Sequence, residues 1–559
     1  MNLQPEKEKV KKIAADGNYN VVPVSCEILS DFTTPIEVMR ILKKASTHCF
    51  LLESAQANET WGRYTFLGYD PKMAISCEAG VLNTGSESFR TEDPSGYLRE
   101  ILARYKSPRF DYLPTFTGGL VGYFSYDYLG YSEKAVRCEV EDSEGFKDVD
   151  LMLFDKVIAF DHLKQKIVLI VNMRVDGESS ETINVDGADS GTTNAAGTDA
   201  ETSCPAGTDS KTAIASGTDM EKSETIRANA ENRMHVKGQF AVTGEKIAEE
   251  YDKAAAELEK LADLIRNGEK LVEQPGRLTG EVTPLFEKEQ YCEMVEKGKH
   301  YIKEGDIFQI VLSNRLSAPF EGSLFDTYRM LRTINPSPYM FYFSGTDVEV
   351  AGASPETLVK LEDGVLHTFP LAGTRPRGKS EEEDAALERE LLADEKELAE
   401  HNMLVDLGRN DLGKISRFGT VEVEELRKVV RFSHVMHIGS TVRGIIREDK
   451  DALDAIEAVL PAGTLSGAPK IRACQLIGQL ENNKRGIYGG AIGYIDFTGN
   501  MDTCIAIRIA YKKNGKVFVR SGAGIVADSV PEKEFEECLN KAKSCLAALE
   551  MEHDGNGAI

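Results

Sequence analysis

Apolar positions recur every three or four residues in three long stretches of the chain, and this spacing predicts helices. The first stretch runs from Glu245 to Ile265 and is closed by Asn267-Gly268. The second is Phe286 to Lys303, and a predicted strand from Ile307 to Ser313 follows it closely. The third runs from Asp394 to Asp411 and carries one apolar stripe, so one of its faces is expected to be buried.

Short apolar runs predict strands in the N-terminal part, from about Val21 to Val171, where they alternate with helical segments. The clearest is Lys166 to Val171, a continuous run typical of a buried strand. The pattern then stops, because no Phe, Tyr or Trp occurs between Phe160 and Phe240. This segment instead repeats Gly-Thr-Asp and is rich in Ala, Ser and Thr. Since it can bury little apolar surface, it is expected to be a disordered insertion; its acids are too sparse to favour a calcium-binding repeat.

The insertion divides the chain, which at 559 residues is too long for one simple core. A hydrophobic content of 41% is typical of a globular protein. We therefore expect an N-terminal domain (1–175), the insertion (176–232), a helical connector (233–282) and a larger C-terminal domain (283–559).

The formal net charge of -25 lacks the excess of positive charge that is typical of proteins that bind nucleic acid or an anionic membrane. The N-terminus, Met1 to Lys12, is charged and lacks an apolar segment, so no signal peptide is expected. No apolar run is long enough to predict a transmembrane span. The 10 cysteines form no Cys-x-x-Cys motif, which favours reduced thiols and a cytoplasmic protein.

Two predicted helices each carry a pair of glutamates three residues apart. Glu397 and Glu400 share one face of the third helix, which Asp394 would cap. Glu534 and Glu537 share one face of a C-terminal helix. Like charges on one face repel each other unless a cation lies between them. Two such pairs are suited to a hard cation with oxygen ligands, and Mg²⁺ fits best; a solvated acidic face is the alternative.

Three local signals add caps and turns to this outline. Ser529 and Glu532 predict a capping box, with Pro531 in the first turn of the C-terminal helix. Pro370 to Arg377 predicts a turn where a ligand could approach the backbone closely. Pro461 to Lys470 is a Gly-rich loop that opens a helix, and its amides could bind an anion. It is not a Walker A loop, because it lacks Gly-Lys-Ser/Thr.

A further strand is predicted to place a cation among small residues. Thr503 to Ala510 alternates isoleucines on one face with Arg508 and two alanines on the other. Such a guanidinium suits a carboxylate, and Gly522 and Gly524 would let backbone amides meet the same group. A salt bridge between Arg508 and a neighbouring acid is the alternative. Gln309 places an amide side chain inside a predicted strand, which makes it a candidate ligand-binding residue. The alternative is a core glutamine whose hydrogen bonds are all made within the protein.

Four motifs in order resemble those of the chorismate-utilising enzymes, and the resemblance covers nearly the whole chain apart from the insertion. The motifs are Glu397 to Asp411, Pro461 to Lys470, Tyr488 to Tyr494 and Gly522 to Asp528. The similarity is greatest to the anthranilate-forming members. It implies an α+β chorismate-utilising enzyme fold, with antiparallel β-sheets in the core and helices outside, plus an N-terminal α/β subdomain packed on it.

The resemblance also implies ligand-binding roles for individual residues. Glu400 and Glu537 would ligate Mg²⁺ directly, and Glu397 and Glu534 would act through water. The two substrate carboxylates would be held by Mg²⁺, by Arg508 and by backbone amides. The implied substrate-binding residues are Gly373, Thr374, Tyr488, Arg508, Gly522, Ala523 and Gly524.

The implied reaction adds ammonia at C2 of chorismate as the C4 hydroxyl leaves, and then releases pyruvate. Because hydroxide is a poor leaving group, a general acid is needed, and Glu356 is the candidate. His437 would move the proton in the elimination, and Thr464 would complete the catalytic set. Ala372 and Gln309 stand where other family members carry lysines. The absence of these lysines favours anthranilate over the products of aminodeoxychorismate, isochorismate or salicylate synthases.

The same resemblance implies feedback inhibition by tryptophan and a second subunit. The implied tryptophan-site residues are Glu53, Ser54, Arg63, Pro338, Tyr339, Met340, Tyr494 and Cys504. No segment resembles the nucleophilic Cys loop of a glutamine amidotransferase, so ammonia is expected from such a partner, in a hetero-oligomer expected to be a heterotetramer. The competing hypothesis is a regulatory subunit that only senses tryptophan. The glutamate quartet, Arg508 and His437 disfavour it.

Overall fold

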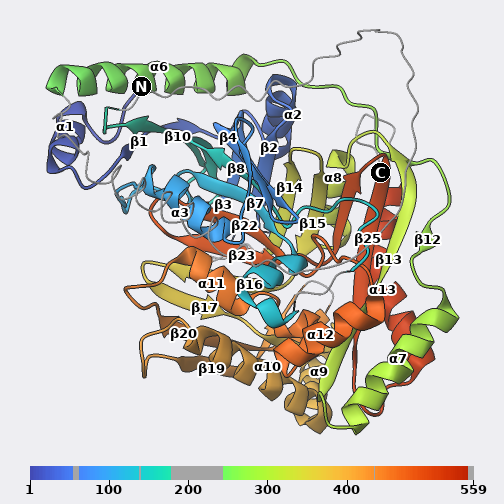
Figure 1. Cartoon of the computed structure of the whole chain (residues 1–559). Helices are drawn as coiled ribbons and strands as arrows, with labels where there is room; N and C mark the ends of the chain where they lie inside the picture. Colours follow the sequence, from blue (N-terminus) through green and yellow to red (C-terminus); the bar gives the residue numbers. More distant parts are fainter. Residues whose placement is uncertain (55–61, 137–139, 178–242, 433–434, 552–559) are drawn as a thin grey trace, which may run out of the picture.

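The computed structural model describes residues 1–54, 62–136, 140–177, 243–432 and 435–551. Within these ranges two antiparallel sheets lie at the centre of the molecule, and helices cover their outer faces (Figure 1). This is the α+β architecture that the family resemblance implies. The expected insertion lies almost entirely outside the described residues.

Both sheets contain strands from the N-terminal and the C-terminal parts of the chain. The first contains, in spatial order, β1 (Val21–Leu29), β10 (Lys166–Arg174), β9 (Lys156–Asp161), β3 (Tyr64–Tyr69), β2 (Cys49–Glu53), β14 (Tyr339–Ser344), β15 (Glu349–Ser354), β24 (Ile509–Lys513), β25 (Lys516–Ile525), β13 (Gln309–Glu321) and β11 (Arg277–Leu278), with β12 (Thr283–Pro284) and β21 (Gly467–Ala468) also on β13. The second contains β18 (Leu371–Pro376), β20 (Val435–Ile445), β17 (Val365–Thr368), β16 (Thr357–Glu362), β23 (Met501–Ile505), β22 (Ala491–Asp496), β7 (Gly119–Phe124), β8 (Val149–Phe154), β4 (Met73–Glu78), β5 (Val81–Asn83) and β6 (Ser88–Arg90), with β19 (Glu422–Arg431) also on β20.

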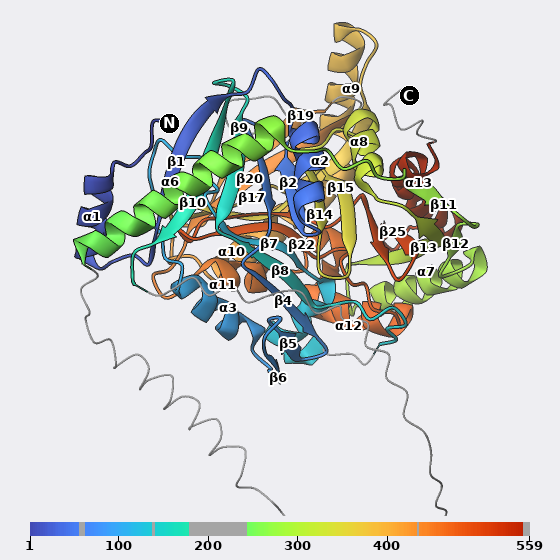
Figure 2. The same cartoon turned by 90° about the horizontal axis from the view of Figure 1, so that it is seen from above.

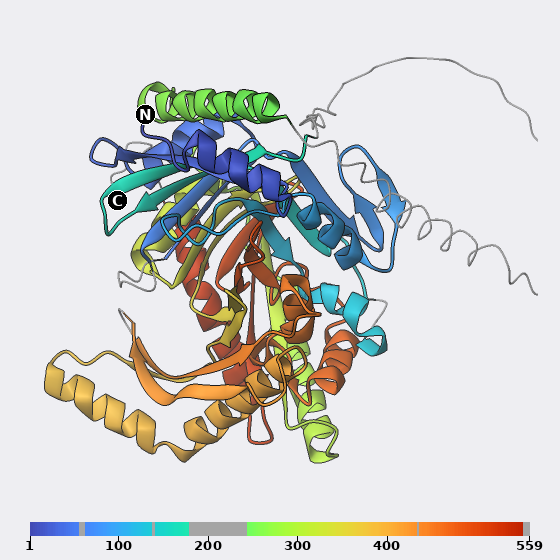
Figure 3. The same cartoon turned by 90° about the vertical axis from the view of Figure 1, so that its left-hand side faces the viewer.

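The helices pack mainly on the outer faces of these sheets. The first sheet is covered by α1 (Lys7–Asp16), α2 (Pro35–Ala45), α6 (Gly244–Asn267), α8 (Phe325–Ile334) and α13 (Pro531–Glu550). The second is covered by α3 (Pro94–Ala103), α10 (Glu395–Gly413) and α11 (Ala452–Val459). A further cluster contains α7 (Lys288–Lys303) and α12 (Lys470–Glu481), and α9 (Glu381–Ala393) projects from the body (Figures 2 and 3).

An aromatic core fills the space between the two sheets. It includes Phe50 and Phe341 from the first sheet and Tyr123 and Phe154 from the second. Strands β8 and β9 are buried along their whole length, because side chains pack against both of their faces.

The sheets continue across the expected boundary between the two domains. In the first sheet β2 pairs with β14, with Glu53 opposite Met340. In the second sheet β7 pairs with β22, with Gly122 opposite Gly493. The N-terminal and C-terminal parts are therefore joined by backbone hydrogen bonds in both sheets.

The helices predicted from periodicity are confirmed, but one predicted cap is wrong. Helix α6 extends the Glu245 to Ile265 prediction by a few residues, and Thr243 caps it. Asp394 caps α10 as expected. For α13 the N-cap is Val530, with Pro531 in the first turn, so the predicted capping box does not form. The Ser529 hydroxyl accepts instead from the Val526 amide at 3.1 Å.

The strand predictions are confirmed at Lys166 to Val171, which lies in β10, and at Ile307 to Ser313, most of which lies in the longer β13. The turn predicted from Pro370 to Arg377 is wrong. That segment forms β18, whose pairing with β20 is irregular between Ala372 and Arg375. Gly373 lies within the irregularity with φ +65°, a conformation that favours glycine.

Candidate active site

Two of the links in which the chain crosses from one sheet to the other lie next to each other. Glu356 lies in the short link from β15 to β16, and Arg508 lies in the link from β23 to β24. The Ile505 amide donates to the Glu356 carbonyl at 3.0 Å, so the two links are tied together. The single strand predicted from Thr503 to Ala510 is therefore wrong. It breaks at Ala506 to Arg508, where Arg508 has φ +52°.

Glu356 has the electrostatics of a general acid that works near neutral pH. Burial raises the pKa of its carboxyl to about 7, against the smaller lowering effects of Thr464, Arg508 and Lys541. The Thr464 hydroxyl donates to Oε1 at 3.1 Å from a 3₁₀ turn, Gly463–Leu465, in the Gly-rich loop. The protonated and ionised forms of Glu356 are thus both populated around pH 7.

Arg508 is a half-buried cation close to Glu356. None of the ion pairs among the described residues includes it; its Nη1 donates to Asn335 Oδ1 at 3.4 Å. Burial lowers the pKa of its guanidinium, and interactions with Cys545 and Glu356 oppose that shift. The alternative of a salt bridge to an acid is therefore not found in the described part of the chain. A guanidinium in this setting is suited to an anionic ligand.

His437 lies on β20 and is held by the segment around Gly373. Its Nδ1 is 2.7 Å from the Gly373 carbonyl oxygen and 3.2 Å from Thr374 Oγ1. Because a carbonyl oxygen only accepts, Nδ1 carries the proton and Nε2 is left as a base. Burial lowers the pKa of His437, and the Arg508 charge lowers it further. The imidazole is therefore neutral near pH 7.

Strand β25 supplies backbone rather than side chains to the same region. It pairs with β24 only as far as Val519, so its edge from Gly522 to Gly524 lies beyond that pairing. A Cβ at Gly522 would lie 3.1 Å from the buried Tyr488 hydroxyl, and one at Gly524 would lie 2.7 Å from Gln309 Nε2. The two glycines thus leave room between the strand and these polar side chains. Ala523, between them, is fully buried.

The glutamate pairs lie on α10 and α13, but they do not gather into one cluster. Among the described residues no group of three or more His, Cys, Asp or Glu side chains is placed to hold a metal ion. Burial raises the pKa of Glu397, and the neighbouring Glu400 adds to the shift. Burial and Glu537 do the same for Glu534. Repulsion within each pair is thus only partly offset by Arg375, 3.9 Å from Glu397, and by Lys541 beside Glu537, and a hard cation would relieve it further.

Lys541 is a residue of this site that the sequence analysis missed. Its Nζ lies 2.8 Å from Glu537 Oε1 and donates to the Gly522 carbonyl at 3.1 Å. Its charge also lowers the pKa of Glu356 and of Glu534. The four-residue spacing from Glu537 was a signal, but such pairs are common on exposed helix surfaces.

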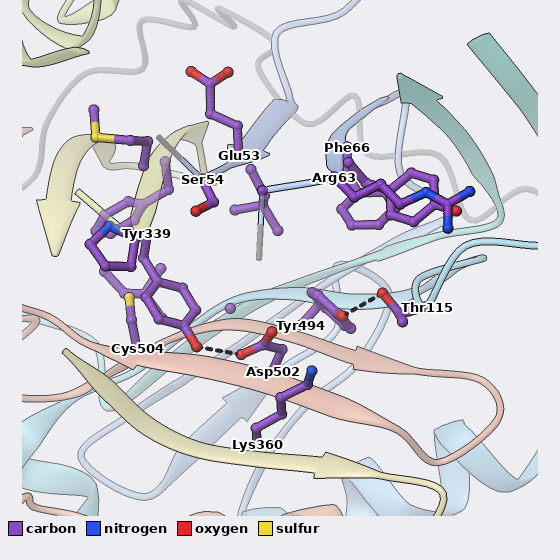
Figure 4. Close-up of a pocket in the computed structure, with 18 of the residues that line it drawn as sticks. Glu53, Ser54, Arg63, Phe66, Thr115, Tyr339, Lys360, Tyr494, Asp502 and Cys504 are labelled. Atoms are coloured by element: carbon purple, nitrogen blue, oxygen red, sulfur yellow. Dashed lines mark hydrogen bonds between the residues drawn. The ribbon is translucent and has the colours of Figure 1, made fainter. Parts of the chain in front are cut away.

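The eight residues expected to bind tryptophan all line one cavity of about 320 Å³ between the two sheets (Figure 4). Strands β2 and β14 supply one wall, and β22 and β23 supply another. The lining also includes Phe66, Thr115, Lys360, Glu362 and Asp502, which the sequence analysis missed. The Tyr494 hydroxyl donates to Thr115 Oγ1 at 3.4 Å.

Two of the eight residues have their charged ends engaged elsewhere. Glu53 pairs with Arg332 at 2.5 Å, and Arg63 pairs with Asp161 at 2.7 Å. The cavity thus combines an aromatic and apolar wall with a few polar groups, as small-molecule sites commonly do.

Comparison with known proteins gives a consistent result. Residues 47–547 match the family model described as chorismate binding enzyme. The chain is 42% identical over 551 residues to anthranilate synthase component 1 of Acetivibrio thermocellus, with 98% of each protein covered. It is 41% identical to the protein of the same name in Pseudomonas aeruginosa, with 98% of each covered, and 38% identical to that of Bacillus subtilis, with 96% of this chain and 94% of the relative covered.

Solved structures agree with these relatives. Anthranilate synthase component I of Streptococcus pneumoniae superposes with a TM-score of 0.64 at 34% identity, covering 88% of this chain and 93% of that one. The menaquinone-specific isochorismate synthase of Escherichia coli superposes with a TM-score of 0.62 at 16% identity, covering 97% and 100%, and so shares the fold. Among the helices of the described residues, none combines the length and apolar character needed to cross a bilayer.

Proposed function

The chain belongs to the family of chorismate binding enzymes, and on that premise we propose that it converts chorismate and ammonia to anthranilate, pyruvate and water. The observation that carries the proposal is the near full-length similarity to proteins named anthranilate synthase component 1, at 37–42% identity. The convergence of Glu356, Arg508 and His437 at one place supports it.

Substrate binding rests on fixed positive charge. Arg508 faces the site without an acidic partner among the described residues and is the proposed contact for one carboxylate of chorismate. The edge of β25 from Gly522 to Gly524 offers backbone amides, and Lys541 adds a second cation. These groups would orient the substrate before any bond changes.

The proposed chemistry uses the two titratable groups in opposite states. Protonated Glu356 gives its proton to the C4 hydroxyl, which leaves as water while ammonia bonds to C2. Neutral His437 then accepts the C2 proton at Nε2 as the bond from C3 to the enolpyruvyl oxygen breaks. The ammonium group formed at C2 returns its extra proton to Glu356, and the departing enolpyruvate takes up the proton held by His437 and becomes pyruvate. The electrons of the C2–H bond complete the aromatic ring.

Mg²⁺ is the proposed cofactor. The donor set fits a hard cation, because all four side chains are carboxylates, and the pKa values of Glu397 and Glu534 are raised by burial and by a like-charged neighbour. Glu400 and Glu537 are the proposed direct ligands, and Glu397 and Glu534 the proposed ligands through water. When bound, the ion supplies positive charge that holds a substrate carboxylate.

Two positions favour ammonia as the nucleophile over the alternatives within the family. Ala372 offers no amine for a covalent intermediate, and Gln309 offers no amine to activate water. Gln309 is buried beside Gly524, at the edge of the proposed pocket. The lysine amines that aminodeoxychorismate and isochorismate synthesis use in the family are therefore absent at these two positions.

We also propose that tryptophan occupies the 320 Å³ cavity and opposes chorismate binding. Since the relatives are named component 1, the proposed source of ammonia is a second component with glutamine amidotransferase activity, in a cytoplasmic hetero-oligomer.

One assay tests the activity, the metal and the inhibitor together. Purified chain is given chorismate, Mg²⁺ and an ammonium salt, and anthranilate is followed by its fluorescence with and without tryptophan or EDTA. Anthranilate formation that falls with either addition is expected. A different chorismate product would refute the choice of reaction, and no turnover would favour the regulatory-subunit hypothesis.

A further inference from the structure

Tyr339 connects the two sheets at the wall of the cavity. It is the first residue of β14, in the first sheet, and its ring lines the cavity. Its hydroxyl donates to Asp502 Oδ1 at 2.8 Å (Figure 4). Thr357 Oγ1 lies 2.9 Å from the same hydroxyl. Asp502 and Thr357 belong to β23 and β16 of the second sheet. One side chain therefore bridges the cavity and both sheets.

Thr357 leads directly to the proposed general acid. It follows Glu356 in the chain, and the pairing of β16 with β23 is irregular between Thr357 and Val359. An irregularity of this kind changes where neighbouring side chains point. On the other side of the same link, Ser354 lies opposite Tyr339 in the β14–β15 pair. The Glu356 link is thus flanked by contacts of Tyr339 on both sides.

A second contact runs in the same direction. Asn335, whose Oδ1 accepts from Arg508, lies three residues before Pro338, which lines the cavity. The segment from Asn335 to Tyr339 therefore touches the cavity, Arg508 and the neighbour of Glu356. Both sheet-crossing links of the active site have a contact with this one segment.

Building on the proposed inhibition by tryptophan, we propose that Tyr339 and Thr357 are positioning residues for Glu356 that couple the cavity to the active site. A ligand that moves the Tyr339 ring breaks or bends its bond to Thr357 and displaces Glu356 from Thr464. Chorismate then binds less tightly, and by linkage chorismate weakens the binding of the cavity ligand by the same factor.

The test measures this factor directly. The dissociation constant of tryptophan is determined by calorimetry with and without saturating chorismate, in the absence of ammonia so that no turnover occurs. Tyr339→Phe removes only the hydroxyl, and Thr357→Val removes its partner, which does not line the cavity. For both, the affinity for tryptophan alone is expected to stay within about threefold of the parent, while the coupling factor falls by about fivefold.

Tyr494→Phe is the matched control, because it removes a cavity hydroxyl whose bond leads to Thr115 and not to the active site. It is expected to keep the coupling factor of the parent. If the parent binds no tryptophan, the proposed inhibition itself falls. If the parent shows coupling and Thr357→Val keeps all of it, the inhibition stands and this inference is overturned. Should Tyr339→Phe lose tryptophan binding, reduced coupling in Thr357→Val still supports the inference.

Discussion

The pH dependence of turnover offers a sharp test of the role proposed for Glu356. Burial raises the pKa of this carboxyl from 4.5 to about 7. About half of the molecules then carry the protonated acid at pH 7, whereas a carboxyl at the ordinary value would be protonated in fewer than about 1%. The catalytic rate should therefore fall as pH rises through about 7, where Glu356 loses its proton.

The fall in rate with rising pH is the alkaline limb of the pH profile. Thr464→Val should shift this limb in a direction that the structure determines. The Thr464 hydroxyl donates to Glu356 Oε1 at 3.1 Å and stabilises the carboxylate, so removing it raises the pKa of Glu356 further. A hydrogen bond to a charged group contributes about 1.5 kcal/mol or more, and one pKa unit corresponds to about 1.4 kcal/mol. The limb is therefore expected to move upward by roughly one pH unit.

The measurement is kcat/KM for chorismate from about pH 5 to about pH 9, at a constant concentration of unprotonated ammonia. Thr503→Val is the control, since Thr503 Oγ1 donates to the Val359 carbonyl and touches no acid of the site. Its limb should stay where the parent has it. Glu356→Gln should slow turnover by about 100-fold or more and remove the limb. A limb that stays in place or moves down in Thr464→Val would refute the assignment.

Four further predictions follow from the same contacts. Because its pKa is raised in the folded state, Glu356 contributes stability below about pH 4.5 that is lost as pH rises through about 7. The free energy of unfolding of Glu356→Gln should therefore exceed that of the parent by up to about 3 kcal/mol at pH 8 and equal it at pH 4. Arg508→Lys loses the planar fork and should raise KM for chorismate by about 10-fold or more with a smaller change in kcat; an unchanged KM would contradict its role. EDTA should abolish turnover, and Glu537→Gln should raise the Mg²⁺ concentration that gives half-maximal rate by about 10-fold. Turnover that EDTA leaves unchanged would contradict the proposed metal dependence. Gly373→Val would place a Cβ 2.9 Å from Leu391 Cδ1 at φ +65°, so thermal unfolding should report a loss of about 1–3 kcal/mol, and a parental melting temperature would contradict this.

The sequence pattern was sufficient where a structure depends on local spacing. Helices α6, α7 and α10 follow from their apolar periodicity, and the caps at Thr243 and Asp394 agree with their ordinary preferences. The break in the Thr503 to Ala510 pattern could not be seen in the same way. Ile505 and Ile509 are both buried, one in each sheet, so the alternation of apolar residues continues through a point where the backbone changes sheets.

The site shows the same division between local and long-range information. Three-residue spacing was enough to place each glutamate pair on one helix face. It could not show that Lys541 lies against Glu537, because the i,i+4 spacing is equally typical of a solvated helix. The contact of Tyr339 with Asp502 joins residues 163 positions apart, and no local pattern marks such a pair.

The placement of Glu356 and Arg508 in the two sheet-crossing links has a consequence for how the enzyme can be controlled. Neither residue belongs to the interior of a strand, so their separation depends on how the two sheets sit relative to each other. The cavity that holds Tyr339 opens between those same sheets. A ligand there needs no contact with chorismate to change the active site, because any change in the spacing of the sheets at the cavity alters both links at once. Well-packed cores respond to a ligand bound between two sheets by moving between discrete arrangements rather than by deforming locally.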